Sequence, residues 1–97
     1  MKYMNGWDVE LAVQRTAARP VQNKAARFLY EYMEQVNAHS DGWAYWAAPV
    51  RSAARLMSLV ESPVEITEQQ FRSALIPIKS FYTRRGRAAG MTYPEVL

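Results

Sequence analysis

Asp41–Ser62 reads DGWAYWAAPVRSAARLMSLVES, and its apolar residues recur at steps of three or four. This spacing places them on one side of an α-helix: Trp43, Trp46, Val50, Ala53, Met57 and Val60. The polar line that remains is narrow and comprises Arg51, Arg55, Ser58 and Ser62. A helix that is apolar over most of its circumference needs neighbours on several sides. The sequence therefore predicts that this stretch is the central element of a helical domain.

Pro49 divides this stretch. A proline inside a helix removes one hydrogen bond and clashes with the preceding turn, at a cost of about 3 kcal/mol. Either the helix begins near Pro49, with residues 42–48 forming a separate short turn, or one longer helix kinks there. The first arrangement is favoured, because a proline at the first helical position loses no hydrogen bond. We therefore predict a helix at residues 49–61.

The same periodicity predicts three further helices, at residues 7–18, 20–37 and 68–85. Asn5 is a good N-cap for the first of them. Thr67 and Gln70 fit the capping-box pattern, which marks the start of the last one. Pro77 is expected to kink or divide that helix. Residues 88–97 are expected to form a C-terminal tail that either packs on the domain or stays mobile.

Composition limits the class of protein. With 97 residues and 49% hydrophobic content, the chain has the size and the apolar content of one small globular domain. It contains no cysteine, and its longest apolar run is far shorter than the roughly 20 residues that cross a bilayer. We predict a single small all-α domain of about four helices, in an irregular, proline-punctuated packing. We also expect it to be cytoplasmic, with no membrane partner.

Positive charge is concentrated in the second half of the chain. Residues 1–48 carry five basic and five acidic side chains, so the whole net charge of +3 comes from residues 49–97. Between Gln69 and Pro94 there are five basic residues and no acidic one. A basic region of this kind favours nucleic acid or an acidic protein surface as the partner.

The sequence offers little for catalysis. Its only histidine, His39, lies in a predicted turn, and the nearby Asp41 has no nucleophile to complete a catalytic arrangement. There is no Gly-rich phosphate loop and no metal-ligand spacing. We therefore expect a protein that is not an enzyme, with no catalytic residues, no metal site and no cofactor.

The last predicted helix and the residues after it carry the candidate nucleic-acid-binding side chains. Arginine and lysine bind phosphates, and glutamine or arginine near a helix N-terminus can reach base edges. The candidates are Gln69, Arg72, Ser73, Lys79, Arg84, Arg85 and Arg87. Tyr82 and Tyr93 are interleaved with them and are expected either to stack on bases or to pack. The alternative is a solvated helix end whose cations interact with the helix dipole.

The predicted helices 49–61 and 68–85 also allow a helix-turn-helix interpretation. The link between them, residues 62–67, is longer than the usual turn of three or four residues. Three carboxylates near this link would repel phosphates: Glu61, Glu65 and Glu68. This docking geometry is therefore kept as a hypothesis only.

The stretch with which we began carries the candidates for protein binding. Arg51 and Arg55 are one helical turn apart, so they could hold a phosphate or a partner's carboxylates, or pair internally with Glu31 or Glu34. The aromatic cluster before Pro49 is either core or part of an interface, since tryptophan and tyrosine dominate binding hot spots. Its members are Trp43, Tyr45 and Trp46.

Two functions remain open at this point. The leading hypothesis is a small nucleic-acid-binding, most simply DNA-binding, regulatory protein that uses the basic C-terminal region. The alternative is a protein-binding inhibitor or adaptor that uses the exposed aromatics and the arginines, and a viral or plasmid-borne regulator would fit either class. A homodimer is a third arrangement, because a small domain with surplus apolar surface can complete its core with a second copy.

Overall fold

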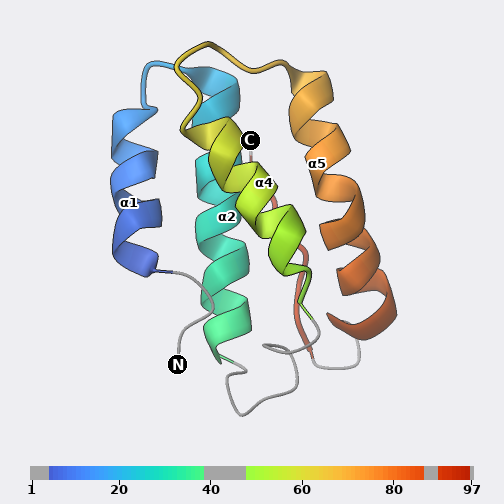
Figure 1. Cartoon of the computed structure of the whole chain (residues 1–97). Helices are drawn as coiled ribbons and strands as arrows, with labels where there is room; N and C mark the ends of the chain where they lie inside the picture. Colours follow the sequence, from blue (N-terminus) through green and yellow to red (C-terminus); the bar gives the residue numbers. More distant parts are fainter. Residues whose placement is uncertain (1–4, 39–47, 87–89, 97) are drawn as a thin grey trace.

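The computed structural model describes residues 5–38, 48–86 and 90–96. These contain four α-helices, and no strand occurs among them, which confirms the predicted all-α class. The helices are α1 (Gly6–Arg15), α2 (Pro20–Ala38), α4 (Val50–Val60) and α5 (Glu68–Phe81), and a π-helical turn, η1 (Tyr82–Gly86), follows α5. In Figure 1, α1 and α5 lie on opposite sides of the bundle, with α2 between them and α4 crossing in front. No helix of the described residues is long and apolar enough to cross a bilayer.

Among the described residues the central element is α2, and not α4, the helix of the Asp41–Ser62 stretch that was expected to be central. Residues 41–47 of that stretch lie outside the described residues. α2 packs against α1, α4 and α5 and buries large side chains such as Phe28, Leu29 and Tyr32. α4 buries one side only, and Val50 and Ala54 on its other side are exposed. Alanine and valine read as apolar in the sequence, but they are small enough to remain at the surface. Of the apolar residues that the sequence placed on one side of this helix, Val50 is therefore at the surface.

Aromatic rings join α2 to the C-terminal part of the chain. Phe28 contacts Phe71 of α5 edge-on, with ring centroids 6.3 Å apart, and Tyr32 contacts Phe81 in the same way at 6.5 Å. Tyr93 of the tail lies 5.2 Å from the Phe28 ring. Each such pair contributes about 0.5–1.5 kcal/mol beyond the area that it buries. The aromatic residues therefore fix α5 and the tail against α2.

The described part of the tail, residues 90–96, packs on the domain. Gly90 has a φ of 77°, a left-handed conformation that reverses the chain. The Gln35 side chain of α2 then forms two hydrogen bonds with the Thr92 backbone, donating to its carbonyl at 2.6 Å and accepting from its N–H at 3.0 Å. Of the two expectations for this segment, packing is the one that the structure shows.

The ends of the helices explain where the chain departs from simple periodicity. α1 ends at Arg15, before the predicted Ala18, and the Thr16 hydroxyl donates to the Ala12 carbonyl at 2.7 Å. α4 begins at Val50, with Pro49 as its N-cap. Pro77 lies inside α5 without dividing it. Pro77 is on the exposed side, where water can hydrate the carbonyl that lacks its helical donor.

Candidate nucleic-acid interface

The start of α5 is fixed by the predicted capping box. The Thr67 hydroxyl accepts from the Gln70 backbone N–H at 3.1 Å, and the Gln70 side chain accepts from the Thr67 N–H at 2.8 Å. Two of the four backbone N–H groups that lack an intrahelical partner at the helix start, those of Thr67 and Gln70, are thereby satisfied. Ile66, directly before the cap, is buried. The first turn of α5 is therefore held in a defined position relative to the link that precedes it.

One side of α5 is buried and the opposite side is exposed. Phe71, Ala74, Ile78 and Phe81 face the core. Five exposed residues recur at steps of three and four, and we call this set the outer stripe of α5: Gln69, Arg72, Ile76, Lys79 and Thr83. Thr83 belongs to η1, and its hydroxyl donates to the Lys79 carbonyl at 3.0 Å, which keeps it in line with the stripe. α5 lies at the outer edge of the bundle (Figure 1).

The structure brings most of the predicted nucleic-acid-binding residues to this region. Gln69, Arg72 and Lys79 lie on the outer stripe, and Ser73 is half-buried beside it. Arg84 and Arg85 are both exposed in η1, which continues from α5. The Arg72 side chain is 79% exposed. Arg87 lies outside the described residues, so its placement stays a prediction.

Glu68 is the only carboxylate in the α5 sequence, and it is engaged by cations. Lys24 of α2 donates to its Oε1 at 2.6 Å, and the Arg72 Nε lies 3.9 Å from its Oε2. The hydrogen bond from Lys24 holds the pKa of Glu68 below its ordinary value of 4.5, and the charges of Lys24 and Arg72 add to this effect. The ion pair therefore stabilises the fold at pH values above the ordinary pKa of the carboxyl group. This contribution is lost as the pH falls through the lowered pKa.

Of the two expectations for Tyr82 and Tyr93, stacking on bases or packing, the structure shows packing. Tyr82 is only 3% exposed, and its ring meets the half-buried Tyr93 ring edge-on at 5.3 Å. Burial raises the pKa of both phenols above 10. The rings face inward because they fill the space between α5 and Tyr32 of α2. Tyr82 is therefore not available to a base, and Tyr93 is available only in part.

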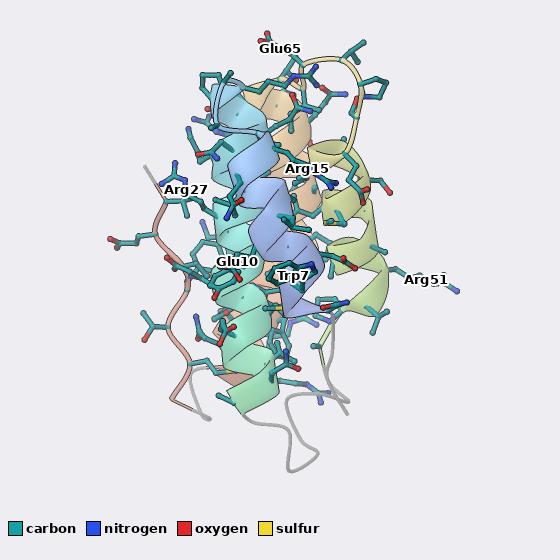
Figure 2. The ribbon with its side chains drawn as sticks, turned by 90° about the vertical axis from the view of Figure 1, so that its left-hand side faces the viewer. Trp7, Glu10, Arg15, Arg27, Arg51 and Glu65 are labelled. Atoms are coloured by element: carbon teal, nitrogen blue, oxygen red, sulfur yellow. The ribbon has the colours of Figure 1, made fainter. Side chains whose placement is uncertain are left out.

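The second candidate surface, on α4, is described only in part. Arg51 and Arg55 are exposed, and Figure 2 shows Arg51 extending away from the bundle. Among the described residues, neither forms an ion pair with Glu31 or Glu34, so internal pairing is not observed. Val50 beside them is 63% exposed. The aromatic cluster Trp43, Tyr45 and Trp46 lies outside the described residues, as do His39 and Asp41.

Three acidic side chains lie together on a different part of the molecule. A groove of about 430 Å³ between α1, α2 and the tail is lined by Glu10, Glu31 and Glu95, together with Arg27. Figure 2 shows Glu10 and Arg27 on this side. Three carboxylates thus line a groove between α1, α2 and the tail, whereas the exposed cations Arg84 and Arg85 lie in η1. Within the described residues, no group of three or more His, Cys, Asp or Glu side chains could hold a metal ion.

A larger groove of about 680 Å³ runs between α1 and the end of α4. Its charges are mixed, because Arg15 and Arg19 line it together with Asp8 and Glu61. Arg19 also has a partner within the domain, because its Nη1 donates a hydrogen bond to the Ser62 carbonyl at 3.0 Å. This groove therefore lacks the excess of positive charge found at α5 and η1.

Comparisons of the chain with protein-family models, with curated proteins and with solved structures gave no match. The functional argument consequently rests on the geometry of α5 and η1. Sequence reasoning missed two members of the outer stripe, Ile76 and Thr83. Helical spacing could have found them. Steps of three and four residues from Gln69 lead through Arg72 and Lys79 to Thr83, and Ile76 occupies the position between Arg72 and Lys79 on the same side of the helix.

Proposed function

We propose that this protein is a non-enzymatic nucleic-acid-binding protein, with a regulatory role, that binds phosphates through the cations of α5 and η1. The observation that supports this is the exposure of four cations in one continuous helical segment: Arg72, Lys79, Arg84 and Arg85. The only carboxylate of α5 already accepts a hydrogen bond from Lys24, so its repulsion of phosphates is reduced. Cations in this arrangement release counterions from a phosphate backbone when they bind it.

The test is a salt series with a labelled duplex, followed by fluorescence anisotropy. If all four cations engage phosphates, a rise from about 50 to about 200 mM salt is expected to weaken binding about 150-fold. Replacing one of them, as in Lys79→Ala, should reduce the log–log slope by about 0.9. Arg15→Ala is the matched control, because Arg15 is an exposed cation on α1. Two outcomes would contradict the proposal: equal log–log salt slopes for the two variants, or an affinity that does not change with salt concentration.

A protein-binding inhibitor or adaptor is the second candidate, and the exposure of Val50 beside Arg51 and Arg55 favours it. Apolar and cationic groups together are typical of a surface that recognises an acidic protein. This function predicts that the chain, recovered from its native host, retains a partner protein after nuclease treatment. The double variant Arg51→Glu, Arg55→Glu should release that protein, whereas Lys79→Ala should not.

A further inference from the structure

Ile76 occupies the middle of the outer stripe of α5, and its side chain is 66% exposed. Arg72 stands one turn before it and Lys79 one turn after it. An exposed isoleucine alone requires no explanation. Here, however, a partner that binds the two cations must also cover the apolar side chain between them. The chemistry of Ile76 therefore helps to identify that partner.

Resting on the proposed function, we propose that the nucleic acid is double-stranded DNA, that α5 lies in its major groove, and that Ile76 contacts the 5-methyl group of thymine. The major groove of B-form DNA is about 12 Å wide and admits an α-helix. α5, with 14 residues, is about 21 Å long and lies at the edge of the bundle. The thymine methyl is the one apolar group that a base presents in that groove.

Charge and side-chain type along α5 fit this placement. Arg72 and Lys79 are seven residues apart, so they lie along the same edge of the helix and can follow one line of phosphates. Gln69, at the start of the stripe, has an amide that can pair with an adenine edge. Arg84 and Arg85 extend the positive charge beyond the end of α5. The stripe thus combines phosphate contacts, one amide and one apolar contact.

Other nucleic acids fit this face less well. Single strands are usually bound on aromatic side chains, but Tyr82 is buried and Tyr93 is half-buried. Within the described residues, Trp7 is an exposed aromatic, but it lies on α1, on the opposite side of the bundle from α5 (Figures 1 and 2). Double-stranded RNA has a deep, narrow major groove that does not admit a helix, and its uracil lacks the methyl group.

The test compares a hairpin duplex of alternating A·T pairs with the same duplex in which deoxyuridine replaces every thymidine. Losing the methyl contact should weaken binding of the wild-type protein roughly fourfold, the value of one buried methyl group. Ile76→Ala should weaken binding to the thymidine duplex and show no further loss with deoxyuridine. Val50→Ala is the matched control, since Val50 is a similarly exposed β-branched residue on α4, and it should keep the fourfold difference.

Three outcomes would overturn the inference: equal binding of the two DNA duplexes by the wild type, equal sensitivity of Ile76→Ala and wild type to deoxyuridine, or equally tight binding of the corresponding RNA duplex. Each of these can occur while salt-dependent binding persists, so the proposed function would survive. Absence of binding to any duplex or single strand would instead reject both. Because Ile76 is exposed, helical circular dichroism should be unchanged in Ile76→Ala, so a loss of binding cannot be attributed to unfolding.

Discussion

Gln22 is the polar side chain most deeply placed in the bundle, and it ties the first turn of α2 to the end of α4. It is 1% exposed, and its Nε2 donates to the Val60 carbonyl at 3.3 Å and to the Ser62 carbonyl at 3.0 Å. The last carbonyls of a helix have no partner within the helix itself. Gln22 thus supplies donors to the end of α4, at the point where the link to α5 begins.

Gln22→Glu keeps the shape of this side chain but exchanges the donor for a carboxyl group. A carboxylate facing two carbonyl oxygens away from water is strongly disfavoured, so the folded state should hold the neutral acid. Protonating a carboxyl group with an ordinary pKa near 4.3 costs about 3.7 kcal/mol at pH 7. Losing one of the two N–H donors costs roughly 1 kcal/mol more. Together these are a large part of the roughly 5–15 kcal/mol expected for a domain of this size.

The pH dependence follows from the sign of the shift. The pKa of the introduced carboxyl group is raised in the folded state, so the folded state binds a proton that the unfolded state releases. The loss of stability is therefore small near pH 4 and grows as pH rises toward the raised pKa. Urea unfolding followed by circular dichroism should show about 2.7 kcal/mol more loss at pH 7 than at pH 5.

Gln22→Met is the matched control, because it removes the same donors without adding a titrating group. The decrease in its free energy of unfolding, relative to wild type, should be the same at pH 5 and pH 7. If Gln22→Glu is also equally destabilising at pH 5 and pH 7, the carboxylate has access to water. The reasoning from a dry contact between α2 and α4 would then be refuted.

Two further predictions concern the start of α5. Thr67→Ala removes the capping hydroxyl and should lower the free energy of unfolding by about 1 kcal/mol in urea titrations, and an unchanged midpoint would contradict the capping role. Glu68→Gln removes the negative charge beside Arg72, so binding to a duplex should tighten and the salt slope should increase by up to about 0.9, measured by anisotropy. Glu10→Gln, on the acidic side, should leave the slope unchanged, and an equal response of the two variants would argue against an interface at α5.

The helices were predictable because their signals are local. Thr67 and Gln70 form the capping box that their spacing predicted. The spacing of apolar residues at steps of three and four predicted the buried face of α5, including Phe71 and Ile78. Both depend only on residues within one or two turns of each other, and such residues stay together in any packing of the helices.

What could not be predicted depends on contacts between distant segments. Tyr82 is both polar and aromatic, so the sequence left stacking on bases and packing equally open, and the contacts with the distant Tyr93 and Tyr32 decide for packing. The Asp41–Ser62 stretch was expected to be central because its apolar residues, Val50 among them, recur at helical spacing, whereas the structure leaves Val50 exposed at the surface. In both cases the sequence shows the type of side chain but not which other helix covers it.

The same distant contacts determine how α5 would be presented to the proposed duplex. Lys24 and Gln22 lie one turn or less apart on α2, and they bind Glu68 at the start of α5 and the carbonyls of Val60 and Ser62 at the end of α4. Both ends of the link between α4 and α5 are therefore attached to one rigid helix. A helix held in this way loses little conformational freedom on binding, so the cost of ordering falls mainly on the long cationic side chains. That is the property required of a helix that reads a groove, because a displacement of α5 by one side-chain position would replace Ile76 with a different contact.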